Sequence, residues 1–100
     1  MNLERKEIEI LWTAHGMNRQ SEWQRKKGIT RAEFESVATS PEQVVQGDLN
    51  AFVAQSKFKD GLIRVPFVER GGTRKILTVY WTSKVSRYWQ ESEDKNETQI

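Results

Sequence analysis

The chain has 100 residues, enough for one domain with one hydrophobic core. It contains no cysteine and a single histidine, His15, which excludes disulfides, a cysteine nucleophile and a multi-histidine metal site. Only 36% of the residues are apolar and 30% are charged, and no apolar run approaches the length of a membrane span.

The first predicted element is a β-strand. Over residues 7–14, the apolar side chains of Ile8, Ile10 and Trp12 alternate with acidic ones, which is typical of a half-buried strand. A helix is the alternative, because residues 3, 6 and 10 also fit a helical stripe.

Two helices should follow this strand. Residues 17–27 contain no glycine or proline, and Gly28 can end a helix there in a left-handed conformation. Thr30 and Glu33 have the spacing of a capping box, which predicts the start of a second helix. Pro41 disfavours helical geometry in the residue before it, so the second helix should end by residue 40.

The second half of the chain predicts two β-hairpins. Residues 43–46 and 51–58 flank a short loop, and residues 62–69 and 74–82 flank a turn at Gly71 and Gly72. Residues 84–90 can form one more short segment.

Two features refine the strands. The run 76–82 is apolar or β-branched at nearly every position, which predicts a central strand covered on both faces. Pro66 lacks a backbone donor, so its strand is expected to lie at an edge or to carry a bulge.

These elements predict an α+β fold of two layers. The N-terminal strand and the two helices are expected to pack on an antiparallel sheet of three to four strands. Residues 1–90 would form this single domain. Residues 91–100 are polar, acidic and without periodicity, and are expected to be a disordered tail.

The formal charge of +2 hides an uneven distribution. Residues 54–90 carry eight Lys and Arg against two Asp and Glu, a net charge of +6, whereas residues 1–53 carry −1 and residues 91–100 carry −3. A basic segment of this kind favours an anionic ligand such as a nucleic acid. The alternative is that strands place Lys and Arg on a solvated face.

Several short patterns resemble one bacterial protein family. They are Thr13-x-His15, Gly28-Ile29-Thr30, Ser40-Pro41-Glu42-x-Val44, the run from Ile76 to Thr82, and Arg87-Tyr88-Trp89. Over about residues 8–89 they resemble a small domain family similar to the BrnT toxins and, through them, to the RelE-like messenger-RNA ribonucleases of toxin–antitoxin pairs. Lys27 stands where the family usually has Arg, which keeps the charge but loses the bidentate fork.

The resemblance implies a RelE-like fold, RNA as the partner (free or ribosome-bound messenger RNA) and control by a cognate antitoxin protein. A metal-independent ribonuclease of this kind positions the RNA 2′-hydroxyl for in-line attack on its own phosphate, while basic side chains stabilise the transition state. Such a reaction needs no cofactor, no metal ion and no nucleophile from the protein.

The candidate catalytic residues are His15, Arg64, Arg74, Arg87 and Tyr88. An imidazole suits proton transfer near neutral pH, although His15 could equally be a capping or packing residue. Counting outward from the glycine turn sets Glu69 opposite Arg74 and Val79 opposite Arg64, which separates the two arginines by roughly 17 Å. They would then hold successive phosphates. Tyr80 and Tyr88 could stack on a base or donate a hydrogen bond, although Tyr80, in the central strand, is expected in the core.

Further cations are candidates for RNA binding: Arg19, Lys27, Lys57, Lys59, Lys75 and Lys84. The alternative reading of the same sheet is a non-catalytic module that binds nucleic acid or protein. An oligomer is a third possibility, because four tryptophans are many for a polar chain and one could lie in an interface. The N-terminus lacks the apolar stretch of a signal peptide, so a cytoplasmic protein without a membrane partner is expected.

Overall fold

The computed structural model of the chain describes residues 7–91. In chain order its elements are β1 (Glu9–Trp12), α1 (Ala14–Lys27), α2 (Arg31–Thr39), β2 (Gln43–Gln46), β3 (Phe52–Phe58), β4 (Gly61–Arg70), β5 (Thr73–Ile76), β6 (Tyr80–Thr82) and α3 (Val85–Tyr88). The α+β class and the order of strand, helix, helix and hairpins are confirmed. All of the predicted tail except Glu91 lies outside the described residues.

The helix boundaries follow from their caps. Thr30 and Glu33 form the predicted capping box of α2, and Gly28 ends α1 with a φ of 70°. Helix α1 begins three residues earlier than predicted, because the side chain of Thr13 accepts a hydrogen bond from the Gly16 N–H at 2.9 Å and caps the helix there.

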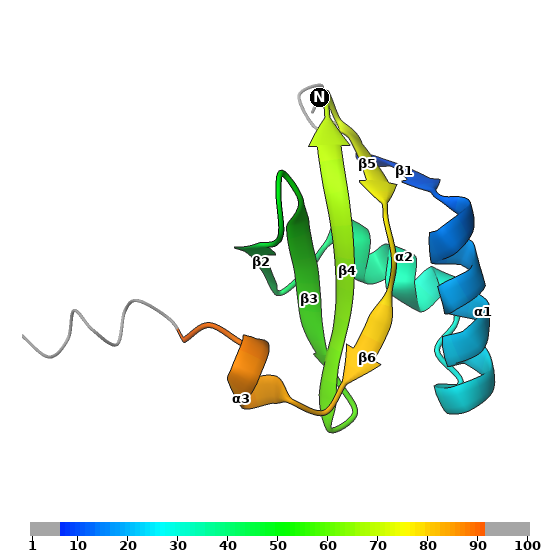
Figure 1. Ribbon diagram of the computed structural model, residues 1–100, viewed down its shortest axis with the longest axis vertical. Coiled ribbons are helices and arrows are strands. Elements are labelled where there is room, and N and C mark those ends of the chain that lie inside the picture. The colour runs from blue at the N-terminus through cyan, green and yellow to red at the C-terminus, as the bar shows by residue number, and fades with distance from the viewer. Residues whose placement is uncertain (1–6, 92–100) are drawn as a thin grey trace, which may run out of the picture.

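The sheet is larger than predicted and mixed. Its six strands follow the order β1-β5-β4-β3-β2, and β6 pairs with β4 next to the stretch that β5 covers. Every pairing is antiparallel except that of β1 with β5. The antiparallel sheet of three to four strands is therefore corrected. Strand β1 lies at one edge, and α1 and α2 carry the chain to β2 at the other edge (Figure 1).

The two faces of the sheet are covered differently. Helix α2 packs on one face, where its Phe34, Val37 and Ala38 join a core with Ile63, Val65 and other apolar side chains of the sheet. Strand residues alternate between faces, so Gln55 and Arg64 project from the other one, which we call the open face. Helix α3 lies on the open face near its lower end (Figure 1).

The central strand is β4, not the run 76–82, which breaks at residues 77–79 between β5 and β6. Val65 and Pro66 of β4 lie opposite these three residues, so the partner of the proline strand carries the irregularity. Pro66 still accepts a hydrogen bond from the Leu77 N–H at 2.9 Å, but it has no N–H to return.

Thr13 completes the broken ladder. Its hydroxyl lies 3.1 Å from the Leu77 carbonyl oxygen and 2.9 Å from that of Ile76, whose oxygen also accepts the Thr13 N–H. A Cβ at Gly16 would lie 3.3 Å from the Ile76 oxygen, so the first turn of α1 touches the strand. The same contacts of Thr13 and Gly16 therefore hold both the break in the ladder after β5 and the first turn of α1 in place.

The close approach at Gly61 gives a stability test. A Cβ there would lie 2.2 Å from the Thr82 carbonyl oxygen and 2.5 Å from the Trp81 ring. We expect Gly61→Ala to lower the free energy of unfolding by about 3 kcal/mol through overpacking, measured by urea denaturation followed by tryptophan fluorescence. The control is Gly28→Ala, where no atom approaches the added Cβ and the positive φ alone costs about 1 kcal/mol. Equal losses in the two variants would contradict the steric argument.

Candidate functional site

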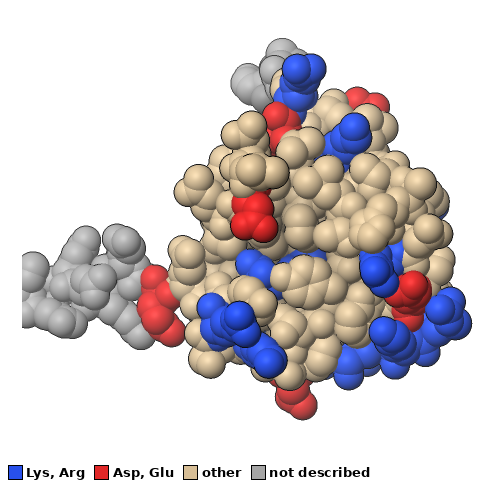
Figure 2. Space-filling model, in the orientation of Figure 1, with Lys and Arg blue, Asp and Glu red and all other residues tan. Residues whose placement is uncertain are grey.

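A groove of about 650 Å³ crosses the open face. Val53, Pro66 and Leu77 line it between residues 46–51 on one side and Tyr80 and Tyr88 on the other. Arg64 is the one cation among the residues that line it. Most of the basic side chains seen on this face lie in its lower half (Figure 2). The groove thus combines an apolar surface with a few polar groups, as ligand sites do.

Arg64 is a buried cation with neutral partners. Only 7% of its surface is exposed, its Nε donates to Gln55 Oε1 at 2.7 Å, and its Nη1 donates to the Tyr80 hydroxyl. The Tyr88 ring lies 3.9 Å from the guanidinium carbon. Within residues 7–91, no carboxylate forms an ion pair with Arg64 and nothing binds its Nη2. The charge is fixed in place and left without a counter-charge.

A chain of side-chain amides supports this arginine. Gln55 is fully buried, and its Nε2 donates to Gln43 Oε1 at 2.6 Å and to the Tyr88 carbonyl oxygen at 3.1 Å. Gln43 in turn donates to the Gln90 carbonyl oxygen and accepts the Gln90 N–H. The chain links β4, β3 and β2 to the C-terminal side of α3, so the same contacts hold the helix and orient Arg64.

His15 lies across the β5–β6 break from the groove. A second depression of about 340 Å³ is lined by His15, Arg19 and Lys26 of α1, and it shares Thr78 and Tyr80 with the groove. The structure therefore brings His15 and Arg64 to two sides of one ridge. Tyr80 is half-buried on the open face and bonded to Arg64, which corrects its expected place in the core.

The cations of the second depression are partly engaged. Arg19 and Glu22 form an ion pair at 2.6 Å on the surface of α1. The hydrogen bond from Arg19 lowers the pKa of the Glu22 carboxyl below its ordinary value. The ammonium of Lys26 lies 4.9 Å from the centre of the Trp23 ring. An anion that enters this depression must compete with Glu22 for Arg19.

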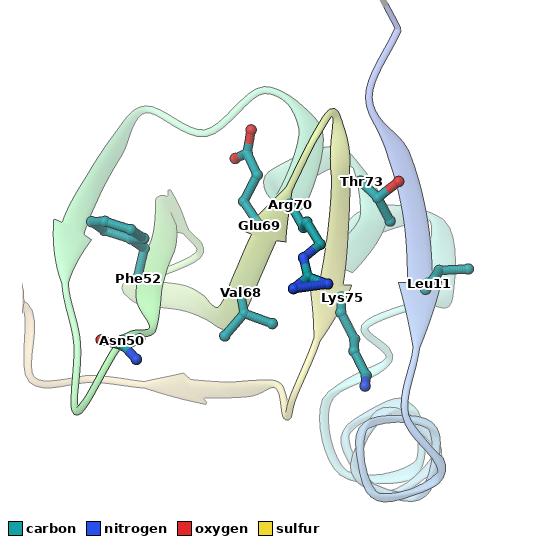
Figure 3. Close-up of a pocket in the computed structure, with 8 residues that line it drawn as sticks. All are labelled: Leu11, Asn50, Phe52, Val68, Glu69, Arg70, Thr73 and Lys75. Atoms are coloured by element: carbon teal, nitrogen blue, oxygen red, sulfur yellow. The ribbon is translucent and has the colours of Figure 1, made fainter.

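A third hollow, a cavity of about 670 Å³, lies towards the β1 side of the groove. Arg70 and Lys75 line it together with Val68 and Leu11 (Figure 3). In this view Val68 and Lys75 point to one side of the sheet and Glu69 points to the other. Asn50, from the same loop that walls the groove, also lines this cavity. The basic surface thus continues along the open face.

Arg74 lies on the other face of the sheet. Its Nη1 donates to the Ala38 carbonyl oxygen at the end of α2, its Nε pairs with Glu69 at 2.9 Å, and it covers the Phe67 ring. The register sets Glu69 opposite Arg74, as predicted, but Tyr80 rather than Val79 opposite Arg64. Because the two arginines occupy opposite faces, they cannot hold successive phosphates of one strand on one surface.

The remaining predicted cations divide between two places. Lys27 covers the Trp81 ring, and Lys59 donates to the Lys27 carbonyl oxygen at 3.4 Å, so both belong to the end of α1. On the open face, Lys57 covers Trp89 at 4.4 Å. Lys84, which precedes α3, and Arg87 of α3 are exposed, and the guanidinium of Arg87 lies 5.5 Å from the centre of the Tyr88 ring.

Asp48 and Arg70 were not predicted at the site, and Tyr80 was expected in the core rather than there. The side of the sheet to which Tyr80 projects depends on the one-residue shift in strand register at residues 77–79. No local sequence pattern predicts this shift. Asp48 follows Gly47 in a hairpin loop, where such a residue ordinarily signals only a turn.

Arg74 provides a second stability test. We expect Arg74→Ala to lower the free energy of unfolding by about 2 kcal/mol, because it removes the bond to Ala38 and uncovers Phe67. The matched control is Arg87→Ala on the exposed helix α3, which should stay within about 0.5 kcal/mol of the native chain. Urea denaturation measures both, and an unchanged Arg74→Ala variant would contradict a structural role.

Within residues 7–91, no group of three or more His, Asp or Glu could hold a metal ion, and no helix is long and apolar enough to cross a membrane. In comparisons with known proteins, no family model, no curated protein and no solved structure matches the chain.

Proposed function

We propose that the protein binds single-stranded RNA along the open face, with one backbone phosphate on Arg64. A single observation carries the proposal: Arg64 is 7% exposed, and the side chains that contact its guanidinium, those of Gln55, Tyr80 and Tyr88, are all neutral. A buried charge is costly unless an opposite charge compensates it. A phosphate oxygen at Nη2 would supply that charge, and a guanidinium suits phosphate geometry.

The surroundings of Arg64 favour binding of an RNA strand over binding of a single isolated anion. Arg70 and Lys75 border the neighbouring cavity, and Lys84 and Arg87 lie at and within α3. Tyr88 and Trp89 add rings on which bases could stack. As part of this proposal we place the chain in the RelE-like, BrnT-like class that its short motifs resemble, with a cognate antitoxin as its regulator.

The binding test uses a fluorescein-labelled nine-nucleotide oligouridylate and fluorescence anisotropy at several salt concentrations. We expect the affinity to fall as salt rises, since bound phosphates release counterions. Arg64→Lys should weaken binding about tenfold, because it loses the fork and the bonds to Gln55 and Tyr80.

The matched control is Arg31→Ala, which removes one positive charge from α2 on the opposite side of the sheet. It should leave the affinity nearly unchanged. Urea denaturation of Arg64→Lys verifies that this variant is folded. Equal effects of the two substitutions, or binding that is independent of salt, would refute the proposed interface.

A second function, RNA cleavage, is favoured by the position of His15. The depression that contains His15 shares Thr78 and Tyr80 with the groove. An RNA strand that crosses these two residues would therefore have Arg64 on one side of its phosphate and His15 on the other. In the proposed reaction the 2′-hydroxyl loses its proton to a base and attacks the adjacent phosphorus. The bond to the 5′ oxygen breaks, and this oxygen takes up a proton. The products are a 2′,3′-cyclic phosphate and a 5′-hydroxyl end.

The cleavage test incubates messenger RNA with the protein in a chelator, with and without ribosomes. We expect His15→Ala to lower the cleavage rate by roughly 100-fold, the usual contribution of a general acid or base, and to leave anisotropy binding unchanged. A cleavage rate that His15→Ala leaves intact would exclude the imidazole. Binding without cleavage in either condition would favour the non-catalytic module.

A further inference from the structure

The loop of residues 47–51 brings two side chains to the groove that phosphate binding does not explain. Asp48 and Leu49 both line the groove that contains Arg64. The Asp48 carboxylate has neither a hydrogen-bond nor an ion-pair partner within residues 7–91. Asp48 is exposed, and beside a phosphate site its carboxylate would repel a polyanion unless a group that donates hydrogen bonds faces it.

The loop is held close against the groove. The Gly47 N–H donates to the Ala51 carbonyl oxygen, and the Ala51 N–H donates to the Asp48 carbonyl oxygen, each at 3.0 Å. A Cβ at Gly47 would lie 3.1 Å from Val53, which lines the groove. The wall that carries Asp48 therefore rests directly on β3.

Leu49 is an unusual residue for the tip of such a loop. Its φ is 54°, a conformation that favours glycine or asparagine, and 94% of its surface is exposed. A large apolar side chain kept in the left-handed region and in solvent stabilises nothing in the described fold. Unfavourable local conformations of this kind concentrate at binding sites.

The groove has the size and lining for one nucleotide. Its volume of about 650 Å³ lies within the range of small-molecule sites. Val53, Pro66 and Leu77 offer an apolar surface to the face of a base, and Leu49 can cover it from the loop side. With the phosphate on Arg64, the edge of the base would meet Asp48.

Resting on the proposed function, we infer that the loop of residues 47–51 makes the groove a base pocket that prefers guanine. Guanine presents two adjacent donors, N1–H and the N2 amino group, which match the two oxygens of a carboxylate. Adenine and cytosine present one amino group beside an acceptor nitrogen. Uracil presents one N–H between two carbonyl oxygens that the carboxylate repels.

The test uses labelled nine-nucleotide RNAs of uridine that differ only at the central position, which is G, A, C or U. With the native protein we expect the G strand to bind about tenfold more tightly than the U strand, the discrimination typical of a bidentate contact. Asp48→Asn should abolish this preference and leave the U strand bound as well as before or better, because a negative charge is removed. Asp60→Asn, in the exposed turn between β3 and β4, is the matched control and should keep the preference.

Leu49→Gly separates binding from folding. Glycine suits the positive φ, so this variant should be at least as stable as the native chain, yet it should bind the G strand several-fold more weakly. Equal affinity of the native protein for all four strands would overturn the guanine pocket and leave the RNA interface standing. Failure of every strand to bind would overturn both. A G preference that persists in Asp48→Asn would show that another group reads the base.

Discussion

The absent amide hydrogen of Pro66, in the middle of the central strand, determines how the rest of the structure is arranged. It prevents β5 and β6 from continuing as one strand, and residues 77–79 leave the ladder there. The Leu77 carbonyl turns to the hydroxyl of Thr13, which also caps α1. One missing donor thus shifts the register by a residue, sets where α1 begins and brings His15 beside Tyr80.

Stability and binding draw on the same polar groups. Arg64 is oriented by Gln55 and Tyr80, and Gln55 also holds the backbone of Tyr88. Every polar side-chain atom that is fully buried among residues 7–91 has a partner, so the network is satisfied in hydrogen bonds. It is not satisfied in charge. A protein that needed only a stable sheet could place an apolar residue at position 64, and this is the physical reason for proposing a phosphate ligand there.

Local signals in the sequence predicted what depends on a few neighbouring residues. The capping box at Thr30 was predicted from its spacing, and the left-handed Gly28 and the glycine turn after β4 were predicted from the position of glycine between two expected elements. Arg64 was a candidate from charge, but its burial was not foreseeable, since it depends on the strand register that sets Gln55 opposite it and on Tyr88 from a separate helix. The parallel pairing of β1 with β5 likewise leaves no trace in either strand's own pattern.

Helix α3 has only four residues, too few for a helix to persist in water by its own hydrogen bonds. Its order comes from the Tyr88 ring on Arg64 and from the amides that grip the backbone at Tyr88 and Gln90. The arginine is therefore shared between the helix and whatever occupies the groove. By thermodynamic linkage, an anion that binds the guanidinium also makes local unfolding of α3 less frequent. Occupancy of the groove and the folded fraction of α3 therefore rise and fall together.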